Sequence, residues 1–61
     1  MRITNKQVKE YINCRLHNSS VEELQIKTIE VLKDLSKFPQ ENKYQIRFYF
    51  KVLERLITKY S

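Results

Sequence analysis

A chain of 61 residues has room for one small domain, and 41% apolar with 31% charged residues is the composition of a folded protein rather than a disordered tail. It has no glycine, one proline and one cysteine, which excludes an internal disulfide and disfavours hairpins and phosphate loops. The net charge of +5 favours acidic partners. We therefore expect a single all-α domain over residues 1–61.

The first helix is predicted over about residues 5–17. Thr4 can cap it, because Gln7 stands three residues further on, as in a capping box. Ile3 and Val8 flank this start at the spacing of a hydrophobic staple. The side expected to face the core contains Val8, Tyr11, Ile12, Arg15 and Leu16.

The second helix is predicted over about residues 20–37. Ser19 or Ser20 can cap it, because a glutamate stands three residues beyond each serine. Pro39 disfavours helical geometry in the residue before it and ends or sharply bends the helix. The expected apolar side contains Val21, Leu24, Thr28, Val31, Leu32, Leu35 and Phe38.

The third helix is predicted over about residues 41–60, with a broad apolar face of Ile46, Tyr49, Phe50, Val52, Leu53, Leu56, Ile57 and Tyr60. Short connections favour antiparallel neighbours, so we expect a compact three-helix unit. A core of this size rarely supplies more than about 3–5 kcal/mol without a disulfide, metal or partner. We therefore expect either a dimer or a bound partner, and of the two we favour self-association as a homodimer.

A basic ridge is predicted along the third helix. Five cations stand four residues apart: Lys43, Arg47, Lys51, Arg55 and Lys59. In a helix they span about 24 Å, and like charges at this spacing repel by about 0.2–0.5 kcal/mol per pair. Tyr44 and Phe48 fall within the same ridge. Folding gains nothing from this charge pattern, so the seven residues form a candidate partner-binding surface.

The leading hypothesis is a small non-enzymatic regulator that docks on an acidic protein partner. Aromatic anchors ringed by charge are typical of interface hot spots, and the contacts would come from Arg47, Phe48, Lys51 and Arg55. Two alternatives remain open: the aromatic residues cover the second helix or a dimer mate, and the cations form a solvated face. A composition rich in Lys, Asn and Ile without glycine suggests a phage or plasmid origin.

The alternative function is binding to nucleic acid, with phosphate contacts made by the same ridge and joined by Arg2, Lys6 and Lys9. A helix-turn-helix formed by the first two helices is less favoured. Its second helix begins with Glu22 and Glu23, whose negative charges would repel the phosphates.

An enzyme is not expected, and we assign no catalytic residues and no cofactor. His17 is the only imidazole, and no spacing joins it to a nucleophile. A metal site made by Glu10, Cys14 and His17 would have only three mixed ligands, which is a weak pattern. The apolar runs are too short to insert in a membrane, and a lone cysteine fits a reducing cytoplasm.

Overall fold

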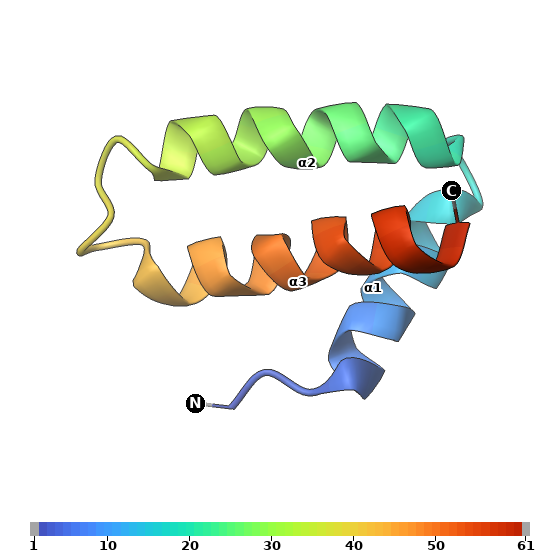
Figure 1. Cartoon of the computed structure of the whole chain (residues 1–61), viewed down its shortest axis with the longest axis horizontal. Coiled ribbons are helices and arrows are strands. Elements are labelled where there is room, and N and C mark those ends of the chain that lie inside the picture. The colour runs from blue at the N-terminus through green and yellow to red at the C-terminus, as the bar shows by residue number, and fades with distance from the viewer. Residues whose placement is uncertain (1, 61) are drawn as a thin grey trace.

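The computed structural model describes residues 2–60, which form three α-helices: α1 (Asn5–Leu16), α2 (Val21–Leu35) and α3 (Lys43–Tyr60). Helices α2 and α3 lie side by side and run in opposite directions, while α1 crosses behind α3 (Figure 1). The predicted all-α, three-helix architecture is confirmed, and the predicted ranges differ from the observed helices only near their ends.

Both predicted helix starts form as side-chain caps. The Thr4 hydroxyl accepts a hydrogen bond from the Gln7 backbone N–H at 3.2 Å, and the Gln7 side chain accepts one from the Thr4 N–H at 3.0 Å. At α2 the cap is Ser20, whose hydroxyl accepts from the Glu23 N–H at 3.2 Å. These bonds satisfy backbone donors that a helix start leaves without partners.

The turn between α2 and α3 begins several residues before Pro39, because α2 already ends at Leu35. The Asn42 side chain donates to the Leu35 carbonyl at 3.2 Å and so ties the start of α3 to the end of α2. The prediction that Phe38 continues the apolar side of α2 is wrong. Phe38 lies beyond the helix, where its direction no longer follows the helical repeat, and it is 62% exposed.

The core lies where the three helices meet, and its buried apolar residues are Val8, Ile12, Leu24, Leu32, Val52 and Leu56. Thr28 is buried among them, and its hydroxyl donates to the Leu24 carbonyl at 2.6 Å. The Gln25 side chain donates to the Leu56 carbonyl at 3.5 Å and links α2 to α3. The buried Thr28 hydroxyl and the half-buried Gln25 amide therefore both have hydrogen-bond partners.

The broad apolar face predicted for α3 is only partly buried. Val52 and Leu56 are 0% exposed, whereas Phe50 is 58% and Ile57 is 55% exposed. Tyr60 is also exposed. The reason is geometric: α1 and α2 cover one side of α3, and the predicted face extends round the helix beyond that side.

Candidate functional site

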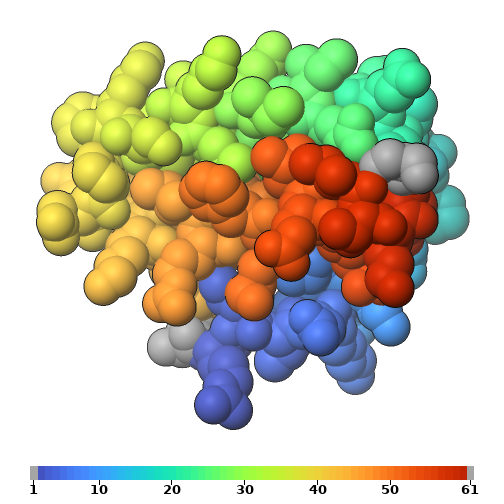
Figure 2. Space-filling view, viewed as in Figure 1, coloured from blue at the N-terminus to red at the C-terminus, as the bar shows by residue number. Residues whose placement is uncertain are grey.

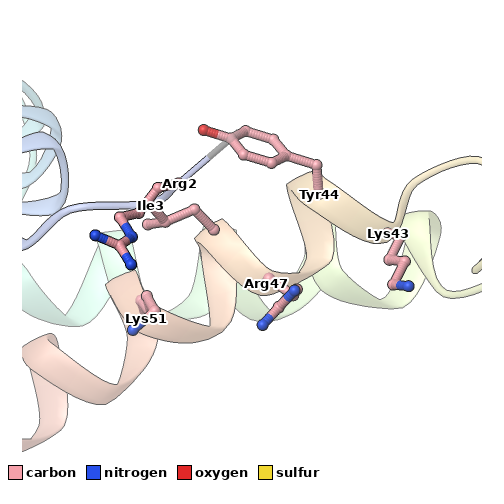
Figure 3. Close-up of a pocket in the computed structure, with 6 residues that line it drawn as sticks. All are labelled: Arg2, Ile3, Lys43, Tyr44, Arg47 and Lys51. Atoms are coloured by element: carbon pink, nitrogen blue, oxygen red, sulfur yellow. The ribbon is translucent and has the colours of Figure 1, made fainter.

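The predicted site residues nearest the start of α3 surround a shallow hollow of about 580 Å³. It is lined by Arg2, Ile3, Lys43, Tyr44, Arg47 and Lys51, and is called the basic hollow below (Figure 3). Helix α3 supplies four of these residues, and the segment before α1 supplies the other two. Figure 3 shows this segment lying across α3, with Arg2 and Ile3 close to Lys51.

Arg2 reaches α3 because the chain before α1 is held in place at two points. Ile3 packs against the core, and Thr4 is bound into the capping box of α1. Of the three cations expected to join the ridge from outside α3, Arg2 lines the hollow. Lys6 and Lys9 are exposed on α1 and are not among its lining residues.

The hollow has an uncompensated positive charge. Four of its six lining residues are cationic and none is acidic. Among residues 2–60, the ion pair that forms lies elsewhere, between Asp34 and Lys37 at 3.8 Å on the surface. A concave surface lined by one sign of charge concentrates the electric field and attracts ions of the opposite sign.

Arg55 and Lys59, the last two residues of the predicted ridge, do not line the hollow. A step of four residues turns a helix by about 40°, so over five cations the ridge winds away from its starting side. Arg55 is partly buried, and its Nε atom is shielded from solvent without a hydrogen-bond partner. Lys59 is exposed in the last turn of α3.

The two aromatic residues of the ridge have different surroundings. Phe48 is partly buried against the core and meets the Tyr11 ring edge-to-face at 5.4 Å and 87°. It meets the Tyr49 ring in the same way at 5.4 Å and 81°. Phe48 therefore covers α1, a neighbour that the sequence alternative did not include. Tyr44 is 36% exposed on the wall of the hollow.

Burial raises the pKa of Tyr49 above its ordinary value of 10.0, and its interaction with the Tyr11 hydroxyl adds to this shift. The unfolded phenol therefore loses its proton first, so the free energy of unfolding should fall as the pH rises above about 10. We expect this fall to be shallower in Tyr49→Phe. Urea unfolding between about pH 9 and 11 measures it, and equal slopes in the two proteins would contradict the assignment to Tyr49.

The described part of the chain contains neither a cluster of metal ligands nor a membrane-spanning helix. Across residues 2–60, His, Cys, Asp and Glu do not form a group of three or more that could hold a metal ion. None of the helices in this range has both the length and the apolar composition needed to cross a bilayer. Cys14 is exposed and carries a free thiol.

Comparison of the chain with known protein families, with curated proteins and with solved structures finds no match. Function is therefore inferred from the basic hollow and its surroundings.

Proposed function

We propose that the basic hollow binds the phosphate backbone of nucleic acid, and that the protein acts through this contact as a small non-enzymatic regulator. The observation that carries the proposal is the lining of the hollow, where Arg2, Lys43, Arg47 and Lys51 meet without a carboxylate. Binding of a phosphate backbone to these four cations would be favourable, because each phosphate that is neutralised releases a condensed counterion.

The chemistry of the lining suits phosphate. Arg2 and Arg47 carry planar guanidinium groups that can hold phosphate oxygens through two hydrogen bonds, and lysines act as point charges. The exposed ring of Tyr44 could stack on a base beside the backbone. These contacts position a strand without reading its sequence, so little sequence preference is expected.

An acidic protein surface, which leads among the hypotheses from sequence, has less support. Such an interface needs an aromatic anchor that enters a pocket on the partner. Phe48 was the expected anchor, and its ring is instead partly buried against α1 and the core. Arg55 was also expected to take part, and it is partly buried away from the hollow.

The test measures the binding of the protein to a short nucleic-acid duplex of random sequence. Fluorescence anisotropy gives the binding constant at several salt concentrations. Four phosphate contacts predict a slope of log K against log salt of about −3.6, and thus about 150-fold weaker binding at 200 mM than at 50 mM. In the double variant Arg47→Ala with Lys51→Ala the slope should fall to about −1.8, with about 200-fold weaker binding at 50 mM.

The matched control is Lys27→Ala with Lys59→Ala, which removes the same charge from exposed positions outside the hollow. We expect this control to bind nearly as well as the parent protein. Equal losses in both double variants would mean that net charge alone drives binding, which contradicts a site at the hollow. Absence of duplex binding at 50 mM, together with salt-tolerant binding to a polyglutamate peptide, would favour the acidic protein partner instead.

A further inference from the structure

The side of the molecule away from α1 exposes large apolar residues from two helices. Ile26 on α2 is 58% exposed and Ile29 is 42% exposed, while Phe50 and Ile57 on α3 are more than half exposed. We call these four the outer apolar residues. Phe50 and Ile57 also line a shallow groove of about 560 Å³. The other residues that line this groove are Leu53, Glu54 and Thr58, together with Arg47 and Lys51 at its border with the basic hollow. Figure 2 shows this side, on which α2 and α3 form the surface and α1 appears along the lower edge.

Helix geometry places the outer apolar residues on one side of the α2–α3 pair. On α2 they lie about 100–160° round the helix from buried Thr28, and on α3 about 140–160° from buried Val52, in the same sense of rotation. For two antiparallel helices packed face to face, the same sense of rotation leads to the same side of the pair. Phe48 lies in the opposite sense of rotation from Val52, and its ring meets Tyr11 of α1 on the other side of the pair.

The chain also exposes more surface than its size predicts. Its accessible surface is 4914 Å², whereas a monomer of 7.5 kDa is expected to expose about 4,250 Å². The excess of about 650 Å² is close to the area of about 800 Å² that each partner buries in a standard interface. Covering one side of the molecule would bring the exposed surface into the normal range.

From these observations we infer that a second copy of the chain covers this side, in a twofold dimer in which α2 packs antiparallel on α2 and α3 on α3. The observation behind this choice is a row of exposed residues on α2 with mirrored spacing: Glu22, Ile26, Ile29 and Lys33. They lie within about 60° of arc and span about 16 Å along the helix.

This row is complementary to a second copy of itself that runs in the opposite direction. When two copies run antiparallel about the midpoint of the row, Ile26 meets Ile29 of the second copy, and Glu22 meets Lys33 of the second copy. A twofold interface requires this self-complementarity. Within residues 2–60 the ion pair formed is Asp34–Lys37, so neither Glu22 nor Lys33 forms an ion pair with another residue of this described range.

Helix α3 is compatible with the same axis. One twofold axis can relate Ile26 to Ile29 of the second copy and also Phe50 to Ile57 of the second copy. This requires that the midpoint between Ile26 and Ile29 on α2 lies level with the midpoint between Phe50 and Ile57 on α3. The Gln25–Leu56 hydrogen bond places these two midpoints at the same level. Each midpoint lies about 4 Å from this contact along its helix, and in the same direction because α2 and α3 are antiparallel.

Charge reversal tests this geometry, with self-association measured by analytical ultracentrifugation over a range of concentrations. Glu22→Lys and Lys33→Glu each convert two attractive contacts across the axis into repulsive ones, so each should weaken the dimer about tenfold or more. The double variant Glu22→Lys with Lys33→Glu restores both attractive contacts and should recover the parent affinity. Additive weakening in the double variant would overturn the proposed pairing.

A second pair of variants tests the apolar part of the face without relying on the charges. Phe50→Asp should abolish the dimer, whereas Phe38→Asp, in the turn after α2, should leave it intact. Both side chains are more than half exposed, and circular dichroism checks that the helices remain. A parent protein that stays monomeric at all concentrations, or equal effects of the two aspartates, would contradict the proposal.

Discussion

Leu56→Ala is expected to leave much of the protein unfolded at 25 °C. The side chain is 0% exposed in the C-terminal half of α3, and it belongs to the cluster that joins all three helices. Truncating a fully buried leucine lowers the free energy of unfolding by about 2–5 kcal/mol, because transfer energy is lost and a cavity remains. A single core of this size supplies only about 3–5 kcal/mol in total.

Urea unfolding followed by circular dichroism measures this loss, at one protein concentration for all variants. Phe38→Ala is the control, because it also removes a large apolar side chain, but from a position that is 62% exposed. We expect the control to change the free energy of unfolding by no more than about 0.5 kcal/mol. Similar losses in the two variants would show that the buried cluster does not dominate the stability.

Tyr11→Ala is the second substitution for which a large effect is expected, a loss of about 2–4 kcal/mol. Tyr11 is the only aromatic residue of α1, and its ring meets Phe48 at 5.4 Å and Tyr49 at 5.9 Å, both edge-to-face. The Arg15 guanidinium lies over the same ring at 5.1 Å from its centre. Removing the ring therefore breaks several contacts between α1 and α3 at once.

The same unfolding measurement tests this expectation, with Tyr11→Phe and Tyr44→Ala as controls. Tyr11→Phe keeps the ring contacts and should retain most of the stability. Tyr44→Ala removes a tyrosine whose ring is 36% exposed, and should have a small effect on unfolding. If Tyr11→Ala were no more destabilising than Tyr44→Ala, the ring cluster would not be what holds α1 in place.

Loss of the Tyr11 ring should also change the position of Arg2 in the basic hollow. Arg2 is held near α3 by Ile3 and by the cap of α1, so its position depends on the packing of that helix. Under conditions where Tyr11→Ala remains folded, we therefore expect its duplex binding to lose part of the salt dependence that Arg2 contributes. This effect depends on the proposed function, whereas the loss of stability does not.

Local sequence features determined where the helices lie. The caps at Thr4 and Ser20, and the position of Pro39, predicted three helices near their observed ranges. Capping and helix termination depend on residues within three or four positions of each other, so they can be read from a single stretch of chain. The spacing of the five cations likewise predicted that Lys43, Arg47 and Lys51 would share one side of α3.

The tertiary structure decided which of these residues act together. The ridge winds round α3, so the crossing of α1 determines that Phe48 is partly buried while Tyr44 stays exposed. It also brings Arg2 to the hollow from the other end of the chain. Helical periodicity shows that a helix has an apolar side, but not how much of that side its neighbours will cover. The exposure of Phe50 therefore depends on how three helices meet in space, which no local pattern records.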